Sequence, residues 1–312
     1  MTFELTILGS SSAIPTSERY LTAQVLKALE RFFLIDCGEG TQIRLRQLNF
    51  SFDRIRHIFI SHLHGDHIYG LPGFISTRNL MGIKTDLHIY SHSELIKLLD
   101  PLLEHLKEDL SFKLVFHPLN FKKFDQIFSD EKMEVFSFPL NHRIPCCGFL
   151  FREKQQIPNL IRQKLEEYRI PVRQLRAIKE GADYVDENGK IIPYTELTYP
   201  PIKPRSYAFC TDTTCLEEVA EYAKEVDLLY HEATFLHLQE DVARQTFHST
   251  AMQAATLALK ANVKKLILGH FSTRYKNTKP FLEEAKTIFE NTELASDGAR
   301  FTIPLQKSAC QN

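Results

Sequence analysis

Four side chains of metal-ligand type lie within six consecutive positions of this sequence, in the segment HLHGDH at residues 62–67. Residues two apart on an extended segment point to the same side, so His62 and His64 can face one point. Asp66 and His67 follow on the next turn and can face a neighbouring point. Imidazole nitrogens and carboxylates are the ligands that Zn²⁺ takes in proteins. The segment therefore predicts a zinc site, because a solvated loop gives no reason for this density of ligands.

Three further ligand-type residues are predicted to lie just past the ends of strands elsewhere in the chain. They are His142, Asp212 and His270. A single histidine at such a place is more often structural than functional. Three such residues in addition to HLHGDH favour one shared crevice at the strand ends, where side chains from separate strands can converge.

The elements that would position these residues are predicted from short apolar runs bounded by Gly, Pro, Ser or Asp. The expected strands are Phe3–Gly9, Phe32–Gly38, Ile55–Ser61, Leu87–Tyr90, Lys113–His117, Met133–Pro139, Gly148–Phe151, Tyr207–Thr211, Asp227–His231 and Lys264–His270. Helical spacing marks Ser93–Leu106, Leu216–Lys224, Ala251–Ala261 and Pro280–Phe289. Early strands follow one another closely, while later strands alternate with helices. We therefore expect an α/β fold of two mixed β-sheets with helices outside, an αββα sandwich.

The composition is that of a globular protein that can bury a full core. The chain has 312 residues, of which 43% are hydrophobic and 25% charged, and its formal net charge is -1. A nucleic-acid-binding protein usually carries excess Lys and Arg. Any affinity for RNA must therefore come from local basic patches and from metal ions.

Neither a membrane segment nor a secretory leader is expected. No apolar run is long enough to cross a bilayer, and the start MTFELTILGS contains an acidic residue and no basic leader. The six cysteines form no CxxC pair. We interpret them as reduced, mostly buried thiols of a cytoplasmic protein.

One long segment, residues 152–205, interrupts the pattern of strands and helices. It contains recurrent prolines and only short helical and turn signals. A loop of this length inside a compact domain is usually functional or disordered. Because strands of the same core resume on both sides, we expect an inserted, flexible arm within a single domain that spans residues 1–312.

The segment HxHxDH after an apolar strand resembles the signature of the metallo-β-lactamase superfamily, and SHLHGDHIYGLPG resembles its RNase Z version. Further motifs extend this resemblance over nearly the whole chain: DCGEGTQ at 36–42, HEAT at 231–234, HST at 248–250, and an N-terminal loop with Leu8-Gly9-Ser10, Pro15-Thr16 and Arg19. The resemblance implies a metallo-β-lactamase αββα fold.

The same resemblance implies two zinc ions per subunit. One ion takes His62, His64 and His142, the other takes Asp66, His67 and His270, and Asp212 bridges them. Two zinc ions can activate a water and stabilise the attacking and leaving oxygens of a phosphodiester. Asp66 could accept the proton of that water.

The general acid implied by the family is His248 of the HST motif, oriented by Glu232 of the HEAT motif. From the residues alone His248 is equally well interpreted as a cap, because Ser249 and Thr250 look like a helix N-terminus. Asp36 either holds a ligand imidazole or begins the turn before Gly38.

His231 is interpreted differently from the neighbouring HEAT glutamate. It ends an apolar run, and we expect it to be a buried, hydrogen-bonded histidine.

As an RNase Z-like protein, the chain is expected to be a cytoplasmic homodimeric endoribonuclease that removes the 3′ trailer of precursor tRNA. The arm is then expected to hold the tRNA body through Arg and Lys side chains, although interspersed acids allow a merely solvated arm. Thr273 and Arg274 are expected to bind phosphate near the metal ions. Thr16 and Arg19 are expected near the acceptor end of the tRNA.

Three other functions share some of these features. A thioester, lactone or small phosphodiester hydrolase of the same fold would share HxHxDH but needs neither an arm nor an additional acid. A non-catalytic RNA-binding scaffold has no reason to keep seven metal ligands. An iron oxidoreductase of this fold usually has a carboxylate where His64 stands.

Overall fold

The computed structural model describes residues 2–104, 109–200 and 202–306, and within these the main strands form two mixed β-sheets of seven strands each. The first sheet has the order β16 (Arg300–Thr302), β1 (Phe3–Gly9), β2 (Ala23–Ala28), β3 (Arg31–Ile35), β4 (Ile55–Phe59), β5 (Leu87–Ser91) and β6 (Leu114–Pro118). The second has the order β15 (Thr292–Leu294), β14 (Leu266–Gly269), β13 (Leu228–Glu232), β12 (Ser206–Cys210), β9 (Cys146–Glu153), β8 (Met133–Leu140) and β7 (Asp125–Ser129).

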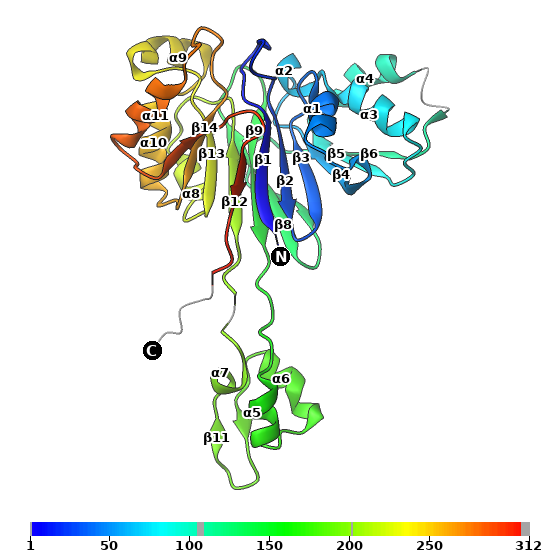
Figure 1. Cartoon of the computed structure of the whole chain (residues 1–312), viewed down its shortest axis with the longest axis vertical. Coiled ribbons are helices and arrows are strands. Elements are labelled where there is room, and N and C mark those ends of the chain that lie inside the picture. Colours follow the sequence, from blue (N-terminus) through cyan, green and yellow to red (C-terminus); the bar gives the residue numbers. More distant parts are fainter. Residues whose placement is uncertain (1, 105–108, 201, 307–312) are drawn as a thin grey trace.

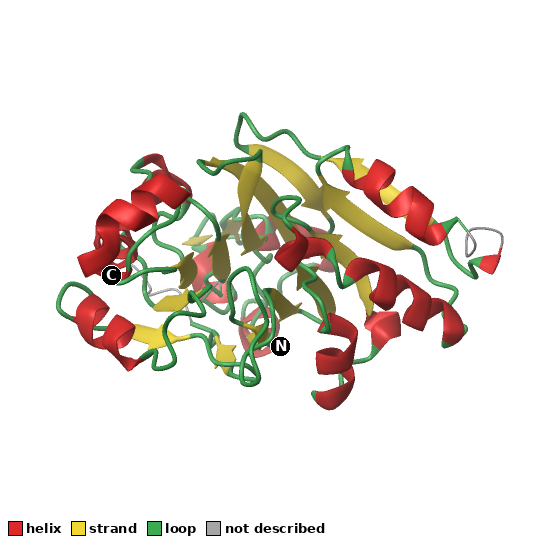
Figure 2. Ribbon diagram, turned by 90° about the horizontal axis from the view of Figure 1, so that it is seen from above, coloured by secondary structure: helices red, strands yellow, loops and turns green. Residues whose placement is uncertain are grey.

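Helices cover the outer face of each sheet, as Figures 1 and 2 show. On the first sheet they are α1 (Thr41–Gln47), α2 (Gly65–Ile68), α3 (Leu71–Leu80) and α4 (Leu95–Leu103), with a short 3₁₀ turn at Phe52–Arg54. On the second sheet they are α8 (Glu218–Tyr222), α9 (Glu240–Thr246), α10 (Ala251–Lys260) and α11 (Lys279–Lys286), with a 3₁₀ turn at His237–Gln239. The expected αββα sandwich is therefore confirmed.

Alternating side chains of the central strands divide the core into three layers. Phe33 and Phe59 point into the layer between the two sheets, whereas Leu34 and Ile58 pack under the helices of the first sheet. A third cluster joins α8, α10 and α11 to the second sheet. Both faces of β12, β13 and β14 are buried, so these strands consist mostly of apolar residues, which made them easy to predict.

The predicted strands and helices are present, most of them with ends that differ by a few residues. The predicted helix Ser93–Leu106 is α4, and its last two residues lie outside the described part of the chain. The prediction missed β2, β7, β15 and β16 in the sheets, and α1, α2, α3 and α9 among the helices that cover them. The strands β15 and β16 have only three residues each at sheet edges, and α3 contains a proline and a glycine that weaken its helical pattern.

Five cysteines lie in the described residues and all are free: Cys37, Cys146, Cys147 and Cys210 are buried and Cys215 is exposed. Cys310 lies outside the described residues. Burial raises the pKa of the Cys37 thiol to about 12, so this thiol stays protonated and inert. Among the described helices, none combines the length and the apolar character needed to cross a membrane.

The segment between β9 and β12 leaves the sandwich as two extended stretches of chain that are not strands of either sheet. It ends in a small folded tip, well separated from both sheets (Figure 1). The tip contains α5 (Arg162–Glu167), a 3₁₀ turn (Val172–Gln174), α6 (Leu175–Lys179), β10 (Tyr184–Val185), β11 (Ile191–Ile192) and α7 (Tyr194–Leu197). A separate apolar cluster of Ile178, Tyr184, Ile192 and Leu197 holds the tip together. We call residues 154–204 the arm.

Three histidines form a stack across β4, β5 and β6 at the edge of the layer between the sheets. The ring of His88 lies 5.0 Å from that of His57 and 5.2 Å from that of His117. His57 also packs edge-on against Phe128 of the other sheet. Burial, together with the neighbouring His88 and His117, lowers the pKa of His57 to about 4.

This stack predicts a loss of stability in acid. Because the folded chain binds the His57 proton less tightly than the unfolded chain, the stability is intact above about pH 6.5 and falls as the pH approaches 4. The difference corresponds to about 3 kcal/mol. Urea unfolding of the native protein and of His57→Phe should show a smaller acid-induced loss in the variant. Equal losses in the two proteins would contradict this origin.

Candidate metal centre

The ligand-type residues predicted from the sequence lie at one edge of the sandwich because the strands that carry them run in the same direction. β3 is parallel to β4, and β12 is parallel to β13 and β14. β8 runs antiparallel to β9, which runs antiparallel to β12, so β8 and β12 share a direction. The carboxyl ends of all these strands therefore meet at one edge, where open α/β sheets build their sites.

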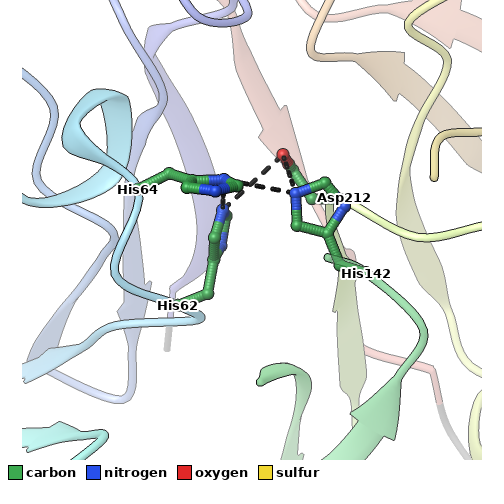
Figure 3. A group of neighbouring side chains, drawn as sticks. All are labelled: His62, His64, His142 and Asp212. Carbon is green, nitrogen blue, oxygen red and sulfur yellow. Dashed lines mark hydrogen bonds and ion pairs between the residues drawn. The ribbon is translucent and has the colours of Figure 1, made fainter. Parts of the chain in front are cut away.

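The first group of ligand atoms belongs to His62, His64, His142 and Asp212, and these atoms all lie within 4.8 Å of one another. The side chains point toward a common centre from three separate loops (Figure 3). His64 Nδ1 lies 3.0 Å from His62 Nε2 and 3.2 Å from His142 Nε2. Asp212 Oδ2 lies 3.6 Å from Nε2 of both His62 and His142. Four donor atoms at these separations can hold one cation.

The second group consists of Asp66, His67 and His270. Asp66 Oδ2 lies 3.5 Å from His67 Nε2 and 3.6 Å from His270 Nε2. Both histidines are buried, and neither Nε2 has a hydrogen-bond partner within the part of the chain that the structure describes. A buried polar atom without a partner is unfavourable. A cation between these three side chains would satisfy both nitrogens, so the residues fit a second metal ion.

Asp212 joins the two groups with its two carboxylate oxygens. Oδ2 faces the first group, whereas Oδ1 lies 3.2 Å from His270 Nε2 and 3.4 Å from His67 Nε2. One carboxylate can therefore contact a cation on each side. The structure thus brings together all seven residues that the sequence singled out as ligands.

Two site residues have backbone conformations that are uncommon outside glycine. His270 has φ 59° and Asp36 has φ 54°, both in the left-handed region. Each follows a parallel strand directly, and the turn aims its side chain at the site instead of along the strand. Such conformations cost of order 1 kcal/mol and concentrate at functional sites.

Asp36 holds a ligand imidazole, which favours this role over the alternative that it only begins the turn before Gly38. Its Oδ2 lies 2.7 Å from His67 Nδ1, and its carboxylate also accepts hydrogen bonds from Ser61 N at 2.8 Å and Ser61 Oγ at 2.9 Å. With Nδ1 of His67 bound to this carboxylate, Nε2 is directed toward the second group.

Electrostatic interactions keep the carboxylates of the site ionised. Burial alone would raise the pKa of Asp212, but the charges of His270 and His67 hold it well below its usual range. The pKa of Asp66 is lowered in the same way. Burial lowers the pKa of His62, so its ring is neutral and offers a lone pair.

His248 and Glu232 form a hydrogen-bonded pair beside the ligands. His248 Nδ1 lies 2.9 Å from Glu232 Oε1, and the glutamate is fully buried. Burial opposes a charge on His248, but the Glu232 carboxylate raises the pKa of His248 to about 9. The imidazole is therefore protonated at neutral pH. It lies close to the ligand-type residues Asp212 and His270.

His248 is not the N-cap of helix α10, which was the alternative interpretation of this residue. Thr250 caps α10, since its hydroxyl accepts a hydrogen bond from Gln253 N and its own N–H donates to Gln253 Oε1. Ser249 Oγ donates to Thr213 O. His248 is thus not needed as a cap. His231, by contrast, is buried with Nδ1 2.7 Å from Glu232 O, which confirms its structural interpretation.

Thr234 connects the His248–Glu232 pair to the metal ligands, and the sequence analysis gave it no role. Its hydroxyl donates to Glu232 Oε2 at 2.7 Å and lies 3.1 Å from His270 Nδ1. Thr234 N also donates to Glu232 Oε2, at 3.0 Å. A buried carboxylate needs such donors. The sequence signal that could have indicated this role is the position of Thr234 in the HEAT motif, two residues after Glu232.

Thr234→Val is expected to lower the free energy of unfolding by about 1.5–3 kcal/mol, because the buried Glu232 carboxylate loses a hydroxyl donor. Thr234→Ser keeps the hydroxyl and should cost less than about 1 kcal/mol. Denaturant unfolding in the presence of a chelator compares the two without a contribution from bound metal. If valine and serine destabilise equally, the hydroxyl has no part in holding Glu232.

The residues predicted to bind substrate in the N-terminal loop have local partners. Thr16 Oγ1 accepts hydrogen bonds from the backbone N–H groups of Glu18 and Arg19. Arg19 Nη2 donates to Tyr275 O at 3.0 Å and so ties this loop to the one after β14. Neither side chain lines the cleft above the metal ligands, which has a volume of about 600 Å³.

The second predicted pair, Thr273 and Arg274, also lies outside that cleft. The guanidinium group of Arg274 lies over the ring of Phe235 at 4.9 Å, and its Nη1 donates to Gln239 Oε1 at 2.9 Å. The sequence did not indicate that this side chain turns toward Phe235 and Gln239.

Three side chains that the sequence analysis did not single out line the cleft: Glu39, Tyr69 and Arg143. The Tyr69 ring is 69% exposed at the rim, two residues beyond HLHGDH. Arg143 directly follows the ligand His142, which was the available signal. An exposed aromatic ring and a guanidinium group beside a cation site suit a substrate that carries both rings and phosphates.

Comparison with known proteins gives relatives over nearly the whole chain. A family model described as "Anti-Pycsar protein Apyc1" matches residues 3–167. Ribonuclease Z of Bacteroides thetaiotaomicron is 48% identical over 301 residues, which cover 96% of this chain and 95% of that protein.

Among solved structures, the short form of human tRNase Z is similar with a TM-score of 0.70 and 28% identity, covering 96% of this chain and 99% of that one. The metallo-β-lactamase fold protein YhfI from Bacillus subtilis has a TM-score of 0.69 at 16% identity, covering 97% of this chain and 100% of that one, and therefore shares the fold.

Proposed function

Since this chain belongs to the ribonuclease Z family, and over residues 3–167 to the family described as "Anti-Pycsar protein Apyc1", we propose that it is the endoribonuclease that removes the 3′ trailer from precursor tRNA. The observation that carries the proposal is the position of the His248–Glu232 pair beside two ligand groups joined by Asp212. A hydrolase with an easily expelled leaving group does not need such an acid, whereas the leaving 3′-oxygen of RNA does.

Two zinc ions are the metal cofactor that we propose. Ligand atoms around a tetrahedral zinc with bonds of about 2.0–2.1 Å lie about 3.3–3.4 Å apart. The separations of 3.0–3.6 Å within the first group support such an ion. The mixed imidazole and carboxylate donors also suit zinc better than magnesium or calcium, which prefer oxygen alone.

In the proposed reaction a water oxygen bonds to the phosphorus and the bond from phosphorus to the 3′-oxygen breaks. When bound, the two zinc ions supply Lewis-acid activation of the water and neutralise charge on the phosphate. His248 donates its proton to the leaving 3′-oxygen, so the tRNA ends in a 3′-hydroxyl and the phosphate stays on the trailer. Glu232 holds the imidazole in the orientation and charge state that this transfer needs.

Asp66 is proposed as a ligand of the second ion. Its Oδ2 accepts a hydrogen bond from Ala13 N at 2.8 Å, which fixes it toward His67 and His270. As the sequence also suggested, we propose that this carboxylate takes the proton that the water loses when its oxygen bonds to the phosphorus.

The proposal is tested by incubating zinc-loaded protein with a precursor tRNA that carries a 3′ trailer and, separately, with glutathione thioesters. We expect a tRNA with a 3′-hydroxyl and a released trailer with a 5′-phosphate, and no comparable thioester turnover. Thioester turnover without trailer removal would instead identify a small-molecule hydrolase of the same fold. Metal binding without either activity would favour an RNA-binding scaffold.

We further propose a cytoplasmic homodimer in which the arm of one subunit serves the site of the other. Asp212 follows the carboxyl end of β12, whereas the arm joins β12 at its amino end. The arm then extends away from the sandwich, so arm tip and metal centre lie at opposite ends of the subunit (Figure 1). A tRNA body held by the arm is therefore more easily presented to a partner's centre. The cytoplasmic location follows from the precursor tRNA substrate.

The contacts in the arm leave only part of its positive charge for tRNA. Arg162, Lys164 and Arg176 form ion pairs with Glu166, Glu167 and Glu180. Arg169, Arg173 and Lys179 are exposed and have no ion-pair partner among the described residues. We propose that these three contact tRNA phosphates.

Removal of the arm is expected to weaken binding of precursor tRNA at least tenfold, while hydrolysis of bis-p-nitrophenyl phosphate changes less than about twofold. The sandwich can close without the arm, because Glu153 N donates to Arg205 O at 2.9 Å and a short Asn-Gly turn can join these positions. Filter binding and a colorimetric assay measure the two quantities. A parallel loss of both would mean that the arm supports the fold.

A mixing experiment separates the dimer proposal from the arm proposal. The arm-deleted protein lacks tRNA binding, and Asp212→Ala lacks the metal centre. If the arm acts on the partner subunit, mixed dimers of the two regain trailer removal. If each arm serves its own subunit, mixing restores nothing.

Thr16, Arg19, Thr273 and Arg274 are retained as proposed contacts of the acceptor end, because both of their loops flank the second ligand group. Ala13 N binds Asp66, and Ser12 N donates to Phe271 O next to His270. Their present partners, the loop carbonyl of Tyr275 and the Gln239 amide, are exchangeable for phosphate oxygens.

A further inference from the structure

A second hollow, of about 620 Å³, lies beside the metal cleft and shares two of its lining residues, His142 and Arg143. It extends from the first ligand group between the loop after β5, the loop between β6 and β7, and the loop after β8. No role in metal binding or proton transfer falls to it. Because the two hollows share a wall, a strand of substrate lying over the metal ions can continue into the second one.

The wall of this hollow carries a base-sized aromatic platform. Phe121 is partly exposed, and its ring lies 5.3 Å from that of His92. Asn120 Oδ1 accepts a hydrogen bond from Lys122 N at 2.9 Å and so fixes the turn that presents Phe121. Aromatic side chains of this kind stack with the bases of single-stranded nucleic acid irrespective of their identity.

The charges around the platform complement a phosphate backbone. Lys122 and Arg143 are exposed, and neither forms an ion pair with a carboxylate among the described residues. The acid in the wall, Asp125, is 3.2 Å from the ammonium group of Lys123, which compensates its charge. Arg143 Nη2 donates to Gln245 O at 3.4 Å, a contact that a phosphate oxygen can replace. Two cations without a carboxylate partner beside an aromatic pair are typical of single-strand binding grooves.

We propose that this hollow binds the first nucleotides of the 3′ trailer as single-stranded RNA. The inference rests on the proposed function. It places the tRNA side of the cleaved bond at the second ligand group and the trailer side at the first. The N-terminal loop and the loop after β14 flank the second ligand group, through the contacts of Ala13 with Asp66 and of Arg19 with Tyr275. The hollow flanks the first group, through His142.

The two flanks therefore separate the two products. With the acceptor end of the tRNA at the loops beside the second ligand group, the chain beyond the cleaved phosphate leaves over the first group into the hollow. The phosphate remains on the trailer after cleavage, and Arg143 at the junction is placed to contact it.

The test compares precursors with a single-nucleotide trailer and with a trailer of roughly ten nucleotides. Combined substitution of Phe121→Ala and Lys122→Gln is expected to raise KM about tenfold or more for the long trailer and less than about twofold for the single nucleotide. Lys84→Gln is the matched control, because this exposed lysine does not line the hollow and has no ion-pair partner among the described residues. An equal change with both substrates, or no change with the long trailer, would overturn the proposal.

A cross-linking experiment gives a readout that does not depend on turnover. A long-trailer precursor with 4-thiouridine at the second trailer position is irradiated with the full protein in chelator, and the attached peptide is identified. We expect attachment within residues 118–122, and attachment elsewhere would contradict the proposal. If the native protein cleaves neither precursor, the proposed function fails, and the cross-link still decides whether this hollow binds single-stranded RNA.

Discussion

Asp212→Ala is expected to remove bound metal and trailer cleavage together. Each oxygen of this carboxylate faces one ligand group, with separations of 3.2–3.6 Å to four imidazole nitrogens. Its loss leaves two incomplete sets of ligands with no shared anion between two cations. We expect the zinc content to fall from two ions to less than one per chain and the cleavage rate to fall at least about a thousandfold.

The control for this substitution is Asp241→Ala, which removes an exposed carboxylate of α9 whose side chain is 81% accessible. It should keep full zinc content and activity. Elemental analysis after dialysis against trace zinc gives the metal content, and circular dichroism verifies that both variants are folded. An Asp212→Ala protein that retains both ions would show that the carboxylate does not bridge them.

His248→Ala is expected to keep both metal ions but lose about 10²–10⁴-fold in turnover of precursor tRNA, the usual contribution of a general acid. The imidazole is placed by Glu232 and is not part of either set of ligands that the sequence singled out. A substrate with a p-nitrophenolate leaving group needs no proton and should be hydrolysed at nearly the native rate by this variant. Equal losses with both substrates would remove His248 from proton transfer.

The pH dependence gives a second check on the same pair. Because the Glu232 carboxylate raises the pKa of His248 to about 9, the native rate should fall only as the pH rises past that region. Glu232→Gln removes the charge that raises this pKa, so the alkaline limb should move to lower pH. An unchanged alkaline limb in Glu232→Gln would contradict the assignment.

The metal centre could be predicted from the sequence because its residues have fixed relations to strands. HLHGDH comes shortly after the end of β4, and Asp212 and His270 come shortly after the ends of β12 and β14. Parallel strands bring their carboxyl ends to one edge of a sheet, so residues far apart in the chain meet there. The pairing of seven ligands into two sets came from family resemblance, since spacing alone does not divide them.

The direction of exposed side chains could not be predicted in this way. Arg274 turns toward Phe235 and Gln239, and Arg19 turns toward a loop carbonyl. Long surface side chains have several rotamers of similar energy, and neighbours distant in sequence select among them. For the same reason the sequence did not show which Arg and Lys side chains of the arm form ion pairs with glutamates.

Short edge strands were missed for a different physical reason. β15 and β16 have three residues each, and they are held by pairing with β14 and β1 and not by their own apolar pattern. β2 was also missed, because its residues AQVLKA contain a single β-branched side chain. Strand pairing across the sheet compensates for this weak local preference.

The central claim is that seven side chains hold two zinc ions on either side of Asp212. Anomalous diffraction at the zinc absorption edge, from crystals grown with zinc, tests it most directly. The account predicts two strong peaks, one among His62, His64 and His142 and the other among Asp66, His67 and His270. A single peak, or peaks away from these residues, would contradict it.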